Sequence, residues 1–304
     1  MPELPEVETV KRGLLKLIVG KKIQTASSDT ARSFPNAEHD VQQFLINATV
    51  TDVRRRAKVL MIDLSTNYTL VIHLKMTGQL VFVETPLSTT YNLLSTAGET
   101  RFAGGHPNDS LVDGLPDKST RVTFDLDDGS HLYFNDQRKF GWVRLMPTAE
   151  VPNIDFMKRV GPEPLEADFT AEQFAARFAR RARTTIKAAI LDQSVIAGVG
   201  NIYADEALWG AKIHPARLVG TITDAEFKQL YLEVRKVMNL SIEKGGSTNR
   251  NYVDAEGKKG SYMDFARVFR REGLLCPRCG TEIIKIRVAG RGTHICPVCQ
   301  LIGK

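Results

Sequence analysis

Four cysteines near the end of the chain constrain the fold more than any other feature. All the cysteines of the 304-residue sequence follow the spacing C-x₂-C-x₁₆-C-x₂-C, at Cys276, Cys279, Cys296 and Cys299. Each short spacer lets both thiolates of a pair face one metal ion, and four thiolates complete the tetrahedral sphere of Zn²⁺. Because no position is left for water, the sequence predicts one structural zinc. Disulfides or redox-active C-x-x-C pairs are the alternative.

The same segment carries the positive charge of the chain. Residues 244–304 contain 12 Lys and Arg against 5 Asp and Glu, a net charge of +7, whereas the whole chain has a net charge of +6. Between the cysteine pairs, 283–288 is predicted as one strand of a hairpin and 290–292 as its turn. A basic terminal segment indicates a polyanionic partner, most often a nucleic acid. A solvated charged face would explain the charge equally well.

Composition excludes several other classes of protein. Hydrophobic residues make up 42% of the chain and charged residues 25%, which is an ordinary globular balance. No apolar run reaches the roughly 18 residues of a transmembrane helix. The N-terminal Met-Pro-Glu-Leu-Pro-Glu has carboxylates where a signal peptide has cations, so we expect a cytoplasmic protein.

Hydrophobic periodicity predicts an α+β protein whose N-terminal part is a β-sandwich or a flattened barrel with a helix attached. A first helix starts near Pro5 and has one apolar stripe. Strand-like composition then predicts strands at 48–64, 69–75, 79–83, 120–126, 131–135 and 142–146. Asp127-Asp128-Gly129 is typical of a hairpin turn. Residues 86–117 have no clear period, and we interpret them as an inserted surface loop.

The second half of the sequence is predicted to be helical. A linker at 148–166 separates it from the strands of residues 1–147. Thr170 and Gln173 form a capping-box pattern, and further helices are expected at 184–192, 202–209 and 224–243. The helical region is predicted to span 167–270, and the zinc hairpin 271–304.

Two segments could carry chemistry. Removal of Met1 would expose the secondary amine of Pro2, and an amine of this kind attacks sugar or carbonyl carbons to form Schiff bases. Glu3 and Glu6 could move protons beside it, although helix capping alone would explain both. The glycine turn at 196–201 precedes a helix, where backbone N–H groups bind phosphate; glycine turns between helices are also common without a ligand.

Basic and apolar residues of the strand region suggest contacts to nucleic acid. Lys58 follows three arginines in what we interpret as the middle of the 48–64 strand. Met76 lies near a turn, and Arg138 and Phe140 lie two apart in a loop. An arginine with apolar wedges can open a duplex, although core packing would explain Met76 and Phe140 taken singly.

Together these segments resemble the formamidopyrimidine-DNA glycosylase family, over nearly the whole chain. The motifs that carry the resemblance are Met-Pro-Glu-Leu-Pro-Glu-Val-Glu-Thr-Val at the start, 161–165, Asn-Ile-Tyr-Ala-Asp-Glu at 201–206, 290–293 and the cysteine pairs. The resemblance implies an N-terminal β-sandwich catalytic domain, a helix–two-turns–helix domain and a zinc-finger hairpin. It implies an enzyme that flips an oxidised purine (8-oxoguanine or a formamidopyrimidine) from duplex DNA, cuts its glycosidic bond and nicks the strand by β,δ-elimination.

The resemblance also assigns roles to residues. Pro2 would attack the sugar C1′, Glu3 would be the general acid/base, Glu6 would support it, and Lys58 would hold a phosphate beside the lesion. The residues implied to bind DNA are His73, Met76, Arg138, Phe140, Asn201 and Arg291. Of these, Met76, Arg138 and Phe140 would fill the gap left by the flipped base, and Arg138 would pair with the orphaned cytosine. A loop at 245–260 would cover the extruded base, and the protein would act as a monomer.

The sequence differs from the family's motifs at some positions, and two other functions are alternatives to the one that the resemblance implies. Ser119 and Arg121 stand where the family commonly has histidines, and Gly292 replaces a serine. An enzyme resembling endonuclease VIII would take oxidised pyrimidines instead. A non-enzymatic zinc-ribbon protein would bind DNA through the same basic segment without needing a free Pro2 amine.

Overall fold

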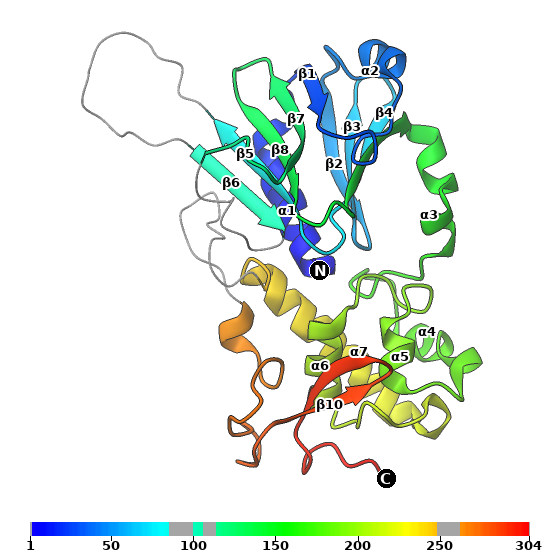
Figure 1. Cartoon of the computed structure of the whole chain (residues 1–304). Coiled ribbons are helices and arrows are strands. Elements are labelled where there is room, and N and C mark those ends of the chain that lie inside the picture. The colour runs from blue at the N-terminus through cyan, green and yellow to red at the C-terminus, as the bar shows by residue number, and fades with distance from the viewer. Residues whose placement is uncertain (1, 85–99, 106–113, 248–261, 304) are drawn as a thin grey trace. The chain divides into compact units, whose positions relative to one another are not determined.

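The computed structural model describes residues 2–84, 100–105, 114–247 and 262–303 (Figure 1). The chain divides into two compact units. The strand unit comprises residues 1–2, 6–157 and 245–261, and the helical unit comprises residues 3–5, 158–244 and 262–304. Within the described ranges, none of the helices combines the length and the apolar character needed to cross a membrane. The domain boundaries expected at 147, 166 and 270 stay predictions.

Two antiparallel sheets build the strand unit. One sheet has the order β1-β7-β8-β5-β6 and the other β2-β3-β4-β9. The strands are β1 (Ile23–Ser28), β2 (Val50–Arg56), β3 (Val59–Leu64), β4 (Tyr68–His73), β5 (Gly78–Glu84), β6 (Thr100–Gly105), β7 (Thr120–Leu126), β8 (His131–Asp136) and β9 (Trp142–Pro147). Both sheets contribute to one apolar core. The predicted α+β class with an N-terminal β-sandwich is confirmed.

Helix α1 (Leu4–Ile18) closes that core. Val7, Val10, Leu14 and Ile18 recur at helical spacing and are at most 1% exposed. All four belong to the core that the two sheets share. The helix ends before Gly20, whose φ of +89° suits a residue without a Cβ. The apolar stripe read from the sequence therefore packs as predicted.

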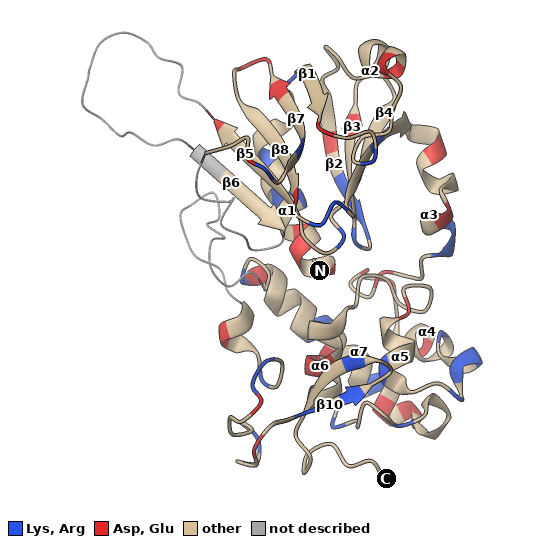
Figure 2. Ribbon diagram, in the orientation of Figure 1, with Lys and Arg blue, Asp and Glu red and all other residues tan. Residues whose placement is uncertain are grey.

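The prediction of one strand over 48–64 is wrong, because the chain reverses in its middle. β2 and β3 pair as a hairpin in which Arg56 faces Val59. Ala57, at the turn, has φ of +52°, a conformation that alanine rarely adopts and that no glycine or asparagine announces here. Lys58 thus lies at a hairpin turn and not in mid-strand. Figure 2 shows basic residues gathered at this end of the hairpin.

The inserted segment 86–117 also contains a strand that the sequence did not predict. β6 pairs with β5 from Gln79 opposite Gly105 to Glu84 opposite Thr100. Gly104 lies in this strand, at a position where a Cβ would overlap the side chain of Val10 on α1. A glycine that suggested a loop in the sequence thus allows a strand and a helix to pack closely. Residues 85–99 and 106–113 lie outside the described residues.

The segments after β9 cover the second face of the four-stranded sheet. They are the short helices η2 (Thr148–Asn153) and α3 (Asp155–Arg159), whereas α2 (Glu38–Phe44), between β1 and β2, packs through Val41 in the core that the two sheets share. Val151 packs with Val59, Met61 and Val71 in a separate apolar cluster. Strands β3 and β4 are therefore buried on both faces, which explains why their sequences do not alternate.

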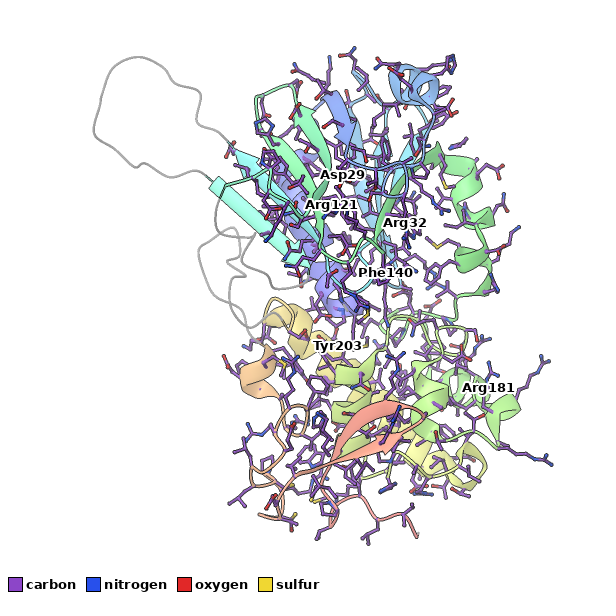
Figure 3. The ribbon with its side chains drawn as sticks, in the orientation of Figure 1. Asp29, Arg32, Arg121, Phe140, Arg181 and Tyr203 are labelled. Atoms are coloured by element: carbon purple, nitrogen blue, oxygen red, sulfur yellow. The ribbon has the colours of Figure 1, made fainter. Side chains whose placement is uncertain are left out.

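Helices dominate the other unit. They are η3 (Ala179–Arg181), α4 (Ala171–Ala176), α5 (Ile186–Leu191), α6 (Asn201–Gly210), η4 (Val219–Thr221), α7 (Asp224–Glu243) and η5 (Tyr262–Phe265). The capping box of Thr170 and Gln173 forms as predicted, and Thr223 and Glu226 form a second one at α7. Tyr203 of α6 is fully buried in their common core (Figure 3).

A hairpin of β10 (Ile284–Val288) and β11 (Arg291–Ile295) completes the helical unit. Val288 pairs with Arg291, so the two-residue turn consists of Ala289 and Gly290, both with positive φ. The predicted turn at 290–292 is thus one residue late. Arg291 opens the second strand, and its side chain is exposed.

Candidate active site and nucleic-acid interface

Glu3 is held at the start of α6 within the helical unit. It is 3% exposed, and its Oε1 accepts a hydrogen bond from the backbone N–H of Ile202 at 3.1 Å. The N-terminal end of a helix carries partial positive charge and favours an ionised carboxylate. Leu4, next in the chain, donates its N–H to the carbonyl of Gly198 at 3.1 Å. The glycine turn at 196–201, predicted to bind phosphate, therefore holds the segment that contains Glu3.

Two other residues of the predicted catalytic set belong to the strand unit. Pro2 is buried, and Glu6 is 5% exposed. Glu6 Oε1 accepts the backbone N–H of Ser247 at 2.9 Å, so this carboxylate fixes the chain shortly after α7 ends. The loop predicted to cover the extruded base continues from there, but residues 248–261 lie outside the described residues.

Lys58 and His73 are neighbours at the adjoining ends of β3 and β4. Lys58 is 4% exposed and His73 is 7% exposed. Burial, aided by the charges of Lys75 and Lys58, lowers the pKa of His73 to about 3. His73 Nδ1 accepts the N–H of Lys75 at 3.0 Å, so the proton of the neutral ring is on Nε2. This arrangement offers positive charge and an N–H donor to a phosphate.

Met76, Arg138 and Phe140 lie on two loops of the strand unit. Met76 is 39% exposed and Phe140 44% exposed, unusually high values for large apolar side chains. The guanidinium of Arg138 lies 5.0 Å from the centre of the Phe140 ring, and that of Arg32 lies 5.6 Å from it. Figure 3 shows Arg32 and Phe140 at the same edge of the unit. An exposed aromatic ring between two guanidinium groups suits insertion into stacked bases.

Asn201 and Arg291 are neighbours within the helical unit. Asn201 Nδ2 donates to the carbonyl of Gly292 at 3.1 Å, which ties the first residue of α6 to the strand that Arg291 opens. Residue 292 contributes its backbone carbonyl to this contact, so glycine in place of the family's serine can make the same hydrogen bond. Asn201 and Arg291, both implied to bind DNA, therefore come from elements that are fixed to each other.

A buried charge network anchors the same hairpin, and sequence reasoning missed it. Lys187 of α5 and Asp205 of α6 are fully buried, with Nζ and Oδ1 2.5 Å apart. Lys187 Nζ also donates to Thr293 Oγ1 at 2.7 Å, and Asp205 Oδ2 accepts the N–H of His294 at 2.9 Å. The available signal was the presence of charged residues inside short, otherwise apolar helices, where they are costly unless paired.

The four cysteines come together as predicted. Their sulfur atoms all lie within 4.8 Å of one another, and no disulfide joins them. Hydrogen bonds from the Thr281 hydroxyl and backbone lower the pKa of Cys279 to about 6, whereas burial and the neighbouring sulfur atoms raise the pKa of Cys299 to about 12, so the charge of a metal ion is needed for all four groups to ionise. Four clustered thiols fit one Zn²⁺.

The contacts of the Trp209 indole with the cysteines are those expected around a structural metal site. Trp209 is 5% exposed, packs with Cys276 and Cys296, and its buried Nε1 has no partner among the described residues by normal hydrogen-bond geometry. Cys276 is the acceptor toward which that N–H is directed. Arg278, between the first two cysteines, stacks on the indole at 3.9 Å and donates to the Trp209 carbonyl at 3.0 Å. Such outer contacts orient the thiolates of a zinc site.

Comparison with known proteins decides the family. The N-terminal domain model of formamidopyrimidine-DNA glycosylase matches residues 1–143, its helix–two-turns–helix domain model matches 160–253, and a zinc-finger model found in these enzymes and in isoleucyl-tRNA synthetases matches 273–302. The chain belongs to the formamidopyrimidine-DNA glycosylase family. The family predicted from the motifs is thereby confirmed, and so is the zinc finger.

Relatives extend this likeness over the full length. A formamidopyrimidine-DNA glycosylase of Pelotomaculum thermopropionicum is 40% identical, with 99% of this chain and all of that protein covered. One from Streptococcus mutans is 38% identical over 99% of both chains. A match of this extent includes the whole N-terminal domain, so the chain is an enzyme of the glycosylase family and not a DNA-binding zinc ribbon alone.

Solved structures give the same result. A Lactococcus lactis glycosylase variant in complex with DNA containing a formamidopyrimidine lesion has a TM-score of 0.82 and 33% identity, covering 99% of this chain and all of that one. The L. lactis enzyme with DNA containing an abasic site also has a TM-score of 0.82 and 33% identity, covering 98% and 99%.

Proposed function

We propose that this glycosylase excises oxidised purines from duplex DNA and then nicks the strand, acting as a monomer on DNA in the cytoplasm. The full-length family match carries the proposal. The buried Glu3 carboxylate beside Pro2 in the chain supports it, because the reaction needs a base held next to the attacking amine.

In the proposed reaction, the amine of Pro2 forms a bond to C1′ of the damaged nucleotide. The bond from C1′ to the base breaks, and the base leaves with its electron pair and takes up a proton. Opening of the sugar ring gives an iminium between Pro2 and C1′, with Glu3 exchanging the proton at the ring oxygen. The iminium acidifies the neighbouring C2′ hydrogen, so that elimination releases the 3′ phosphate and then the 5′ phosphate.

Contacts to phosphate hold the DNA in register during these steps. Lys58 and the neutral His73 would do so from the strand unit, and Asn201 and Arg291 from the helical unit. Met76, Arg138 and Phe140 would occupy the gap in the duplex, which offsets the few kcal/mol that base flipping costs.

A borohydride trap on a duplex with 8-oxoguanine opposite cytosine tests the proposal. Protein with a free Pro2 should form a covalent adduct, whereas protein that keeps Met1 should bind the duplex and form none. Glu3→Gln should lower base excision by about 10²–10⁴-fold while keeping some nicking of a pre-formed abasic site.

Glu8→Gln is the matched control. Glu8 is a buried carboxylate of α1, 8% exposed, but it pairs with Arg55 at 3.0 Å and has no proposed role in proton transfer. Its substitution should leave excision nearly unchanged. A trapped adduct with retained Met1 would remove Pro2 from the role of nucleophile.

Oxidised pyrimidines are a second substrate class to test. One similar solved structure is the L. lactis enzyme with DNA containing an oxidised pyrimidine, at a TM-score of 0.81 and 33% identity. Faster excision of thymine glycol than of 8-oxoguanine by this protein would favour the endonuclease VIII type of specificity.

A further inference from the structure

Asp136, at the end of β8, accepts hydrogen bonds from both loops that carry the exposed apolar side chains. It is 1% exposed. Its Oδ2 accepts the backbone N–H groups of Phe140 at 2.8 Å and Gly141 at 2.6 Å, and its Oδ1 accepts the N–H of Arg138 at 3.1 Å. The Thr77 hydroxyl, from the loop of Met76, donates to the same Oδ1. One carboxylate thus accepts four donors, as many as its lone pairs allow.

The two loops are also joined directly. The N–H of Arg138 donates to Thr77 Oγ1 at 3.2 Å in addition to Asp136. The backbone of Gly141, which follows Phe140, is closely packed, since a Cβ there would lie 2.7 Å from the Phe134 ring and 3.1 Å from Asp136 Oδ2. Met76, Arg138 and Phe140 are therefore exposed side chains on a backbone that is tightly fixed.

Arg121 fixes Asp136 itself. Its Nε donates to the Asp136 carbonyl at 2.8 Å, and its Nη2 to the Lys118 carbonyl at 2.7 Å. Arg121 is 6% exposed and forms an ion pair with Asp29, which lies beside it in Figure 3. The N–H of Asp136 donates to the Ser119 carbonyl at 2.8 Å. The segment that departs from the family's histidines thus supports the base of the Arg138 loop.

We propose that Asp136 is a positioning residue that makes the Met76 loop and the Arg138–Phe140 loop one rigid unit for reading the base opposite the lesion. This inference rests on the proposed function, in which these side chains enter the duplex. Reading a base edge requires a guanidinium held in one orientation, and a fixed backbone lowers the entropy lost when Arg138 engages it.

Two substitutions separate the parts of this unit. Asp136→Asn keeps the size of the side chain, but its NH₂ group would face backbone N–H donors that need an acceptor. Thr77→Val keeps the shape and removes only the bridge between the loops. Asp128→Asn is the matched control, because Asp128 accepts hydrogen bonds from Ser130 at the opposite end of β8 and touches neither loop.

The measurement is excision of 8-oxoguanine opposite cytosine and opposite adenine. The parent and Asp128→Asn should prefer cytosine. Asp136→Asn should lose about 10-fold of that preference, the scale of one base-edge contact, and Thr77→Val should lose less in the same direction. Borohydride trapping on a single-stranded abasic oligonucleotide should stay unchanged in all four proteins, because no opposite base is present there.

Each outcome bears on one idea. A parent that neither excises nor traps contradicts the proposed function and not the role of Asp136. Wild-type preference for cytosine in Asp136→Asn overturns the positioning role. An equal fall in excision on both duplexes and in trapping also overturns it, because such a fall would indicate general destabilisation. If Asp136→Asn does not fold, Thr77→Val decides: unchanged preference in that variant contradicts the rigid unit.

Discussion

Arg138 of the strand unit and Arg291 of the helical unit are both predicted to reach DNA, but they are held by different means. Arg138 lies in a loop whose backbone N–H groups converge on one buried carboxylate, Asp136. Arg291 lies in a hairpin held by four cysteines and by the buried pair of Lys187 and Asp205. The first device fixes one loop through hydrogen bonds close in sequence. The second depends on a metal and on residues about 90 positions apart.

The difference matches the task proposed for each arginine. A base edge is read by hydrogen bonds whose direction matters, so Arg138 needs a fixed backbone. A phosphate attracts a cation from any direction in water, so Arg291 needs the right place more than the right angle. Removal of zinc and loss of the buried ion pair test whether the helical unit can be disturbed without the strand unit, and the pH dependence of His73 tests the strand unit by itself.

Removal of zinc should have the largest effect and should act on the helical unit alone. Metal binding to structural zinc sites contributes about 10–16 kcal/mol, so chelation should unfold the cysteine segment and greatly weaken DNA binding through Arg291. The Trp142→Phe variant leaves Trp209 as the sole tryptophan, and its fluorescence should change with one equivalent of zinc. Thermal unfolding of the strand unit should stay the same. Metal-free protein that binds duplex DNA as before would show that the hairpin does not grip DNA.

Loss of one partner of the buried ion pair should have the next largest effect. Asp205→Asn leaves the ammonium of Lys187 buried without its counter-charge, which costs about 3–5 kcal/mol in the free energy of unfolding. The double change Lys187→Met with Asp205→Asn should recover part of that loss, since no charge is then buried and the amide oxygen can still accept the N–H of His294. Denaturant unfolding of the three proteins gives the comparison. A single variant as stable as the parent would mean that the hairpin does not depend on this pair.

His73 should give the smallest effect at neutral pH, because its contribution to stability appears only as the pH falls below about 6.5. Its pKa is about 3 in the folded protein, against an ordinary value of 6.5, so the unfolded chain binds a proton that the folded one does not between these values. Stability should therefore fall as pH drops from about 6.5 toward 3, and His73→Gln should fall less steeply. Equal slopes for the parent and the variant would contradict a neutral buried ring.

Sequence patterns predicted the parts of the fold that depend on local periodicity and spacing. Helix α7 was expected at 224–243 and occupies those residues, and the cysteine spacing predicted the cluster of sulfur atoms. The turn at Ala57 was missed because its positive φ is imposed by the pairing of β2 with β3 and not by the residue type. β6 was missed because its glycines serve close packing, Gly104 against α1 and Gly105 against β5.

The candidate site shows the same division. The residues that resemble the family motifs were named from the sequence, and their catalytic and DNA-binding roles stay predictions. Asp136 had no predicted role, since nothing in the local sequence shows that four donors from two loops converge on it. Lys187 and Asp205 are 18 positions apart, and only the packing of α5 against α6 reveals that they pair.

Gly200 has a consequence for how this protein can vary. Its φ of −129° and ψ of −162° are open to any amino acid, so the backbone does not require glycine. Space does, because a Cβ at this position would overlap the carboxylate of Glu3. Gly198, with φ of +79°, is restricted by its backbone as well. A library of variants sorted for folding would thus accept alanine at 200 more readily than at 198, whereas one sorted for repair of oxidised DNA would reject both.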